Sequence, residues 1–209
     1  MLGYLLILVE LTYAAAQKHL VSCDTSKGPL EFDIIQSWSP KGVARFLDLV
    51  RAGYYTDIPL HRAIEKWALV FGINTDEKMR KTWNQTIEDD PKHGVPFEHG
   101  TLSFGAGGAN RRSVQLFISY TTNPGFGRYP WETPIGHVST ATRKVLDSIY
   151  TGYGENDPHG LGPNPELIEQ NGNAWVRENY PKLDFIHSCQ VASDPEVVES
   201  PPPDPPREL

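Results

Sequence analysis

Alternation of apolar and polar side chains near the start of the chain predicts a β-hairpin. Residues 30–34 read LEFDI, so apolar and acidic residues follow one another. Successive side chains of a strand point to opposite faces, and this pattern therefore gives one buried face and one exposed face. A second apolar stretch precedes the turn sequence SKGP at 26–29. We expect residues 20–36 to form two antiparallel strands joined by that turn.

Other segments have the period of a helix. In residues 39–52, SPKGVARFLDLVRA, apolar side chains recur at positions i, i+3, i+4 and i+7, which gathers them on one face of a helix. Ser39 is the expected N-cap of this helix. Thr140 is expected to cap a second helix over residues 141–152, and a third helix, interrupted by a glycine, is predicted over residues 165–179.

Short apolar runs elsewhere are typical of strands, and the polar residues 74–99 are expected to form a long loop. Counting the hairpin, we expect eight strands; the other six lie within 58–73 (two strands), 101–105, 114–120, 135–138 and 183–191. Many short strands and few helices favour a mainly β architecture. We predict a closed eight-stranded antiparallel barrel capped by two helices.

Composition restricts the class of protein. The length of 209 residues indicates one main domain with extensions. Hydrophobic residues make up 39% and charged residues 22%, as in soluble globular proteins. The net charge is −7 and no block of Lys and Arg occurs, so nucleic acid is not an expected partner. The seven histidines lack the spacing of metal ligands, and no metal site is predicted.

The two ends of the chain differ from its middle. An apolar run and the small residues AAAQ at 14–17 predict a signal peptide over residues 1–16, or an N-terminal anchor if that segment stays uncleaved. The run is short for a membrane span, and no stable span is expected after processing. Residues 17–192 form the expected domain, and residues 193–209 are acidic and rich in proline, which predicts a disordered tail. The expected location is the lumen of the secretory pathway or the extracellular space, or a membrane surface if the anchor remains.

Four blocks of the sequence carry a family resemblance. They read GPLEFDIIQSWSPKGVARFLDLVRAGYY, LHRAIEKWALVFG, GTLSFGAGGANRRSVQLFIS and TPIGHVSTATRKVLDSI, in that order. Together they resemble the cyclophilin-type peptidyl-prolyl cis-trans isomerases, whose corresponding motifs include Phe-His-Arg-Val-Ile and Ser-Gln-Phe-Phe-Ile. The resemblance covers residues 20–192 and implies a divergent, secretory-type member of that family.

The resemblance implies an isomerase activity, and physical chemistry explains how such an enzyme can work. Rotation about a peptide bond faces a barrier of about 18–20 kcal/mol because resonance is lost in the twisted state. A catalyst can lower this barrier with an apolar pocket for the proline ring and a fixed guanidinium that binds the twisted amide. Such chemistry requires no cofactor. The implied function is isomerisation of X-Pro bonds during folding of client proteins.

The resemblance also assigns roles position by position. Arg62 matches the catalytic arginine, and a guanidinium suits that role because it is always charged and presents a rigid fork of donors. The positions matched to substrate binding are Trp67, Gly105, Gln115, Phe117 and Trp131.

Several positions depart from the family pattern. Val70 replaces a glutamine that orients the arginine, Ala68 replaces a methionine of the pocket wall, and Ala106 replaces an asparagine that binds substrate backbone. Glu132 stands where a histidine is expected. These changes favour the alternative of a weakly active or inactive binding or scaffold module, as a subunit of a larger assembly.

The remaining polar residues have structural or modification roles in our interpretation. His61 is expected to be a hydrogen-bonded structural residue, and Arg111 and Arg112 are expected at a solvated turn. Asn84 begins the sequon Asn-Gln-Thr and is a candidate for glycosylation in a secretory protein.

The cysteines leave two alternatives open. Cys23 and Cys189 are either two buried thiols or, in an oxidising compartment, a disulfide. The family topology places the first and last strands side by side, which would bring these two residues within bonding reach.

Overall fold

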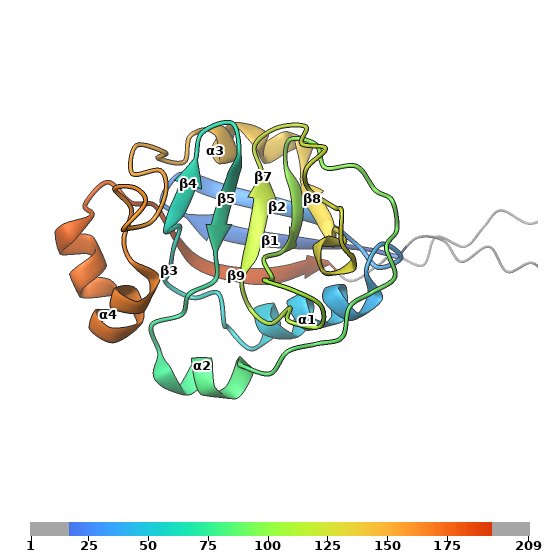
Figure 1. Ribbon diagram of the computed structural model, residues 1–209, viewed down its shortest axis with the longest axis horizontal. Coiled ribbons are helices and arrows are strands. Elements are labelled where there is room, and N and C mark those ends of the chain that lie inside the picture. Colours follow the sequence, from blue (N-terminus) through green and yellow to red (C-terminus); the bar gives the residue numbers. More distant parts are fainter. Residues whose placement is uncertain (1–16, 194–209) are drawn as a thin grey trace, which may run out of the picture.

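Residues 17–193 are described by a computed structural model, in which one curled β-sheet is surrounded by helices (Figure 1). The helices are α1 (Pro40–Arg51), α2 (Glu77–Trp83), α3 (Arg143–Asp147) and α4 (Pro165–Asn179), with 3-10 turns at Pro130–Glu132 and Thr140–Thr142. The strands are β1 (Lys18–Thr25), β2 (Gly28–Ile35), β3 (Ile58–Pro59), β4 (Arg62–Ile64), β5 (Ala68–Phe71), β6 (Thr101–Phe104), β7 (Leu116–Ser119), β8 (Gly136–Val138) and β9 (Phe185–Ser193).

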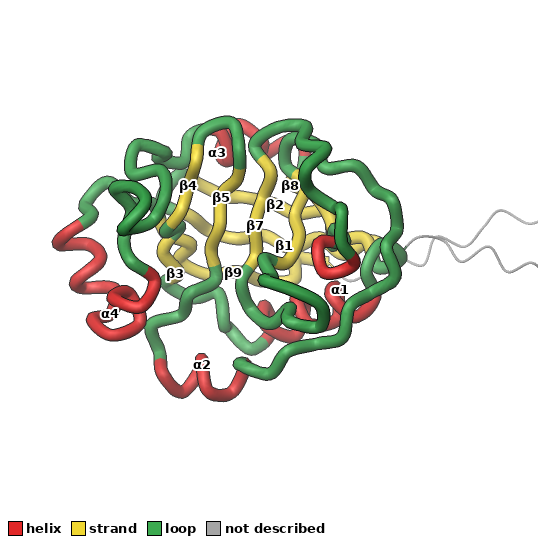
Figure 2. Tube along the Cα trace, viewed as in Figure 1, coloured by secondary structure: helices red, strands yellow, loops and turns green. Residues whose placement is uncertain are grey.

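The sheet is antiparallel and open, which corrects the prediction of a closed eight-stranded barrel. Its nine strands have the order β3-β9-β1-β2-β8-β6-β7-β5-β4. The edge strands β3 and β4 are not paired with each other, although only Leu60 and His61 separate them in the chain. The sheet curls so that β4, β5 and β7 cross in front of β1, β2 and β9 (Figures 1 and 2). Buried side chains from both sets of strands, such as Leu69 and Phe32, belong to one main core.

The predicted hairpin forms and is joined to the end of the domain. Strand β1 pairs with β2 on one edge and with β9 on the other. Cys23 lies opposite Cys189 in the second pairing, and the structure joins them in a disulfide across a Cα–Cα distance of 4.0 Å. The first and last strands of the domain are therefore linked covalently as well as by hydrogen bonds.

The first predicted helix packs its apolar stripe against the sheet. Val43, Phe46, Leu47 and Val50 of α1 are all buried in the main core, as the helical period required. Ser39 precedes this helix but its side chain does not cap it. Instead, the carboxylate of Asp90, from the long segment after α2, accepts hydrogen bonds from the backbone N–H groups of residues 41 and 42.

Arg112 is a second correction. Its side chain is 0% exposed rather than solvated, and its guanidinium pairs with the Asp90 carboxylate at 3.0 Å. It also donates to the hydroxyl of Ser39 and to the carbonyl of Glu88. A buried charge must be paired to be tolerated. These contacts hold residues 88–90 against the start of α1, so part of the expected loop is anchored.

The remaining helices agree with prediction only in part. Residues 74–99 include the short helix α2, capped by Asp76, where only a loop was expected. The second predicted helix is reduced to a 3-10 turn and α3, and the third forms as α4 with a break at Gly172, where φ is 77°. Figure 1 shows α4 beside the β3 edge of the sheet, where its buried residues Ile168 and Val176 form a small second core with Phe185.

The predicted signal peptide or anchor, residues 1–16, and the predicted tail after Ser193 lie outside the described residues. Within residues 17–193, none of the helices has the length and apolar character that a membrane crossing requires.

Candidate active site

Cross-strand pairing places the candidate residues in one row. In the register of the sheet, Arg62 lies opposite Val70, Val70 opposite Phe117, and Phe117 opposite Ser103. Directly paired residues of an antiparallel sheet share a face. The neighbouring row, Leu69 and Ile118 among them, points into the main core. The arginine and the aromatic ring therefore belong to the opposite face, outside the core.

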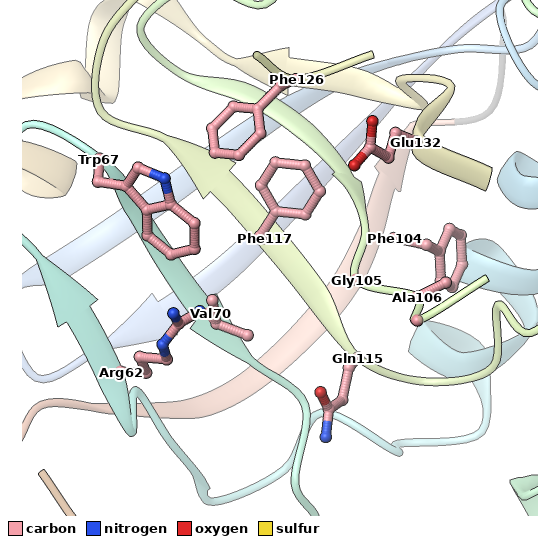
Figure 3. Close-up of a pocket in the computed structure, with 11 residues that line it drawn as sticks. Arg62, Trp67, Val70, Phe104, Gly105, Ala106, Gln115, Phe117, Phe126 and Glu132 are labelled. Atoms are coloured by element: carbon pink, nitrogen blue, oxygen red, sulfur yellow. The ribbon is translucent and has the colours of Figure 1, made fainter. Parts of the chain in front are cut away.

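A pocket opens over this face, with a volume of about 320 Å³. Figure 3 shows Arg62 on one side of it and Glu132 on the other, with the ring of Phe117 between them. The lining comprises Arg62, Trp67, Val70, Phe104, Gly105, Ala106, Gly107, Gln115, Phe117, Phe126 and Glu132. Four of the substrate-binding residues expected from sequence, together with Arg62, thus surround a single cavity.

The floor of the pocket is aromatic. Phe117 is 7% exposed and stacks on Phe97 with the ring centroids 5.5 Å apart. Phe126 packs against both rings and against Trp67. Ala68 and Val70 complete this cluster, which is separate from the main core. This floor is apolar and is held by mutual packing of the rings.

Two further residues hold the Arg62 side chain. The carboxylate of Glu155 accepts from Nε at 2.5 Å and from Nη2 at 2.6 Å, in a bidentate pair. The indole of Trp67 lies 4.4 Å from Cζ, within the range of a cation–π contact. Hydrogen bonding to Arg62 lowers the pKa of Glu155 below its ordinary value of 4.5, so this carboxylate is ionised at neutral pH.

The loop that carries Glu155 is fixed to β4. Gly154 forms a backbone bridge with Ala63, next to Arg62. A Cβ at Gly160 would lie 2.2 Å from the Glu155 carbonyl oxygen, so only glycine permits this return of the loop. The loop therefore reaches the arginine through close backbone packing rather than through a flexible excursion.

His61 fastens the same loop, as a structural residue. The Asn156 amide, turned so that its nitrogen faces carbonyl oxygens, donates to His61 at 2.9 Å and to Pro163 at 3.1 Å, and its oxygen accepts from Nδ1 of His61 at 3.3 Å. Burial lowers the pKa of His61 to about 4, so the imidazole is neutral at physiological pH.

Trp131 does not line the pocket, and this expectation is corrected. Its ring stacks on Tyr129 with centroids 4.4 Å apart, and the 3-10 turn instead presents Glu132 to the cavity. Phe126, five residues earlier, supplies the aromatic wall. Consecutive residues of a tight turn point in different directions, so Glu132 faces the cavity while the neighbouring Trp131 does not line it.

The sequence pattern did not assign Phe97, Phe126 or Glu155 to the site. Phe97 and Phe126 come from segments with no periodic pattern, and Glu155 comes from a Gly/Pro-rich loop. The one signal for the two phenylalanines was that each is an apolar residue outside any periodic pattern of apolar residues. Nothing local indicated Glu155, which lies 93 residues from its partner.

Asn84, the candidate for glycosylation, is not among the residues that line this pocket. Asn84 is exposed at the C-terminal end of α2. Across residues 17–193, acidic, histidine and cysteine side chains do not gather into a group able to hold a metal ion.

Comparison with known proteins gives this architecture a family. Residues 20–161 match the family described as cyclophilin type peptidyl-prolyl cis-trans isomerase/CLD. The chain belongs to this family. The matched segment contains the cross-strand row from Arg62 to Ser103 and also Glu155, but it ends before α4 and β9.

Curated relatives are similar in part of their length. The chain is 30% identical over 143 residues to peptidyl-prolyl cis-trans isomerase-like 2 of Aspergillus oryzae, which covers 65% of this chain and 24% of that protein. It is 27% identical over 107 residues to the Arabidopsis thaliana peptidyl-prolyl cis-trans isomerase CYP18-2, covering 50% of this chain and 65% of that protein. The chain thus aligns with about a quarter of the first relative.

Solved structures show the same fold. A cyclophilin-type peptidyl-prolyl cis-trans isomerase of Cryptosporidium parvum superposes with a TM-score of 0.62 at 19% identity, covering 85% of this chain and 99% of that one. A structure of the same protein in the presence of the dipeptide Ala-Pro gives a TM-score of 0.59.

Proposed function

We propose that this chain is a peptidyl-prolyl cis-trans isomerase that acts on X-Pro bonds of client proteins through Arg62 and the aromatic pocket. The observation that carries the proposal is the convergence of Arg62, Gln115 and Phe117 on one cavity. Its volume of about 320 Å³ suits a proline side chain and the adjoining backbone. Membership of the isomerase family supports the reaction class.

The proposed mechanism uses two parts of the site, the aromatic pocket and the guanidinium of Arg62. Phe117, Phe126 and Trp67 hold the pyrrolidine ring, whose apolar surface is removed from water there. The guanidinium of Arg62 donates to the carbonyl oxygen or the developing lone pair of the prolyl nitrogen as the amide twists. Binding the twisted amide more tightly than the planar one lowers the barrier. No bond between heavy atoms forms or breaks.

The direct test compares wild type with Arg62→Ala in an NMR exchange assay on an Ala-Pro peptide. We expect the exchange rate to fall by roughly a hundredfold, since a single preorganised donor typically contributes that much. Arg111→Ala removes an exposed arginine and serves as the control. Equal rates in wild type and Arg62→Ala would exclude the proposed function.

A second candidate function is a binding or scaffold module with little or no turnover. Val70, Ala68, Ala106 and Glu132 occupy places where the family carries supporting groups, and this favours it. Peptide binding detected by chemical shift changes, with no catalysed exchange, would support this candidate and its place in a larger complex.

We further propose that the protein follows the secretory route, either free in a lumen or outside the cell, or tethered by residues 1–16. The disulfide between Cys23 and Cys189 supports an oxidising compartment. Asn84 is exposed and accessible to glycosylation. Expression in secretory cells should give a band that shifts on deglycosylation and does not shift in Asn84→Gln; an unmodified cytosolic product would contradict the route.

A further inference from the structure

We infer that Glu155 is a positioning residue that orients Arg62 for catalysis in place of the absent polar side chain at position 70. The inference rests on the proposed function. It identifies a role for the loop after α3, which no sequence pattern assigned to the site.

The geometry defines which donors remain available to a substrate. Glu155 occupies Nε and Nη2 of Arg62, and Nη1 takes no part in that pair. A bidentate pair fixes the plane of a guanidinium, because two parallel hydrogen bonds leave no rotation about the terminal bond. The Trp67 ring at 4.4 Å restrains the same group from one face. The guanidinium that lines the pocket is therefore held in one orientation.

The position from which a polar side chain could orient Arg62 lies directly opposite it, on β5. Val70 is the cross-strand partner of Arg62 and lies on the same face, where paired Cβ atoms are about 5 Å apart. Valine has no hydrogen-bonding group, so β5 cannot orient the arginine. The support comes instead from the other side of β4, where Gly154 and Ala63 pair.

The charge of Glu155 makes its ion pair with Arg62 depend on pH. Arg62 lowers the pKa of Glu155, so the pair persists above pH 4.5 and weakens as pH falls through the lowered pKa. The other titratable groups near this carboxylate are His159 and the neutral His61. Across the pocket lies Glu132. Each of these is retained in a Glu155 variant, which allows the contribution of Glu155 to be isolated.

The test measures kcat and KM for an Ala-Pro peptide in wild type, Glu155→Ala and Glu155→Gln. We expect kcat to fall roughly ten- to a hundredfold in Glu155→Ala, with KM nearly unchanged, because misorientation of the donor affects the twisted state most. Glu155→Gln should lose less, since its amide oxygen still accepts one hydrogen bond. Wild-type activity should decline at the acidic end of the profile, and Glu155→Gln should lack that decline.

Two controls separate positioning from general damage. Glu65→Ala removes an exposed carboxylate that pairs with Lys66 near the same hairpin, and should leave kcat unchanged. Val70→Gln in the Glu155→Ala background should recover part of the lost kcat, because a polar supporter then faces Arg62 from β5. Structural damage alone would not be repaired at position 70.

The outcomes distinguish this role from the proposed function itself. A slowly exchanging Arg62 Nε–H signal in NMR spectra, lost in Glu155→Ala, would show that the carboxylate orients the guanidinium even if wild type were inactive. An active wild type with an equally active Glu155→Ala variant would overturn the inference and leave the function standing. A faster Glu155→Ala variant would also overturn it, because the carboxylate would then compete with substrate for Arg62.

Discussion

Val70 lies directly between Arg62 and Phe117, paired with the first on one edge of β5 and with the second on the other. One apolar side chain thus separates the guanidinium from the ring that forms the pocket floor. Its position keeps the floor continuous, and it leaves orientation of the arginine to the loop at Glu155.

Val70→Gln as a single change is expected to alter kcat by less than about twofold, because Glu155 already fixes Arg62 in the wild type. It should lower the free energy of unfolding by about 1 kcal/mol, since a half-satisfied amide replaces a valine that is only 9% exposed. Kinetics and urea titration check the two effects. A large gain in kcat would mean that the wild-type arginine is poorly oriented.

The disulfide should contribute strongly to stability. Cys23 and Cys189 close a loop with a sequence separation of 166 residues. In the chain-entropy account, a loop of this length stabilises the folded state by about 5 kcal/mol. The double variant Cys23→Ser with Cys189→Ser should lose that amount in urea titrations, and a reducing agent should destabilise the wild type but not the variant. A reducing agent without effect would contradict this role.

Asp90 should be among the most sensitive positions for folding. It is 2% exposed and pairs with the fully buried Arg112. Removing it strands a buried cation, so Asp90→Ala should cost about 3–5 kcal/mol. Asp48→Ala, which removes an exposed carboxylate next to Arg51, is the matched control and should cost little. Equal losses in both variants would show that Arg112 finds a substitute partner.

Protonation of Asp90 should also lower the free energy of unfolding at acidic pH. Burial alone would raise its pKa, but hydrogen bonds from Ser39, two backbone N–H groups and Arg112 outweigh burial and lower it below 3.8. The stabilisation is therefore complete above the unfolded pKa near 3.8 and is lost as pH falls through the lowered folded value. Unfolding free energies measured from pH 6 to about pH 2 should decline less in Asp90→Asn than in wild type. Parallel declines would assign the acid limb to other groups.

Glu132 should influence which peptides bind. It lines the pocket, its carboxylate accepts from the backbone N–H of Arg128, and it makes no ion pair with Lys or Arg within residues 17–193. Arg62 is neutralised by Glu155, so the cavity has a net negative charge. Peptides with Lys beside the proline should be preferred over Glu by roughly two- to fivefold, and Glu132→Gln should remove this preference. Competition binding at low salt checks it, with Glu98→Gln as the control for overall charge.

The sequence determined the elements whose patterns are local. The alternation at 30–34 and the helical stripe of α1 require burial of one face wherever the chain packs, and both elements form as expected. The block LHRAIEKWALVFG placed Arg62 on a predicted strand. Gln115 and Phe117 are two residues apart, which placed both on one face. These features depend on repeat distances along the backbone, which the sequence contains.

The tertiary structure decided what depends on distant segments. Arg112 and Asp90 become a buried pair only because the segment after α2 returns to α1, and the N-cap of α1 comes from Asp90 rather than from the adjacent Ser39. The sheet is open because its two edge strands, β3 and β4, pair with β9 and β5 and not with each other. Glu155 reaches Arg62 across 93 residues through a loop that glycine allows to turn. Contacts of this kind are fixed by packing of the whole domain, and no local period in the sequence records them.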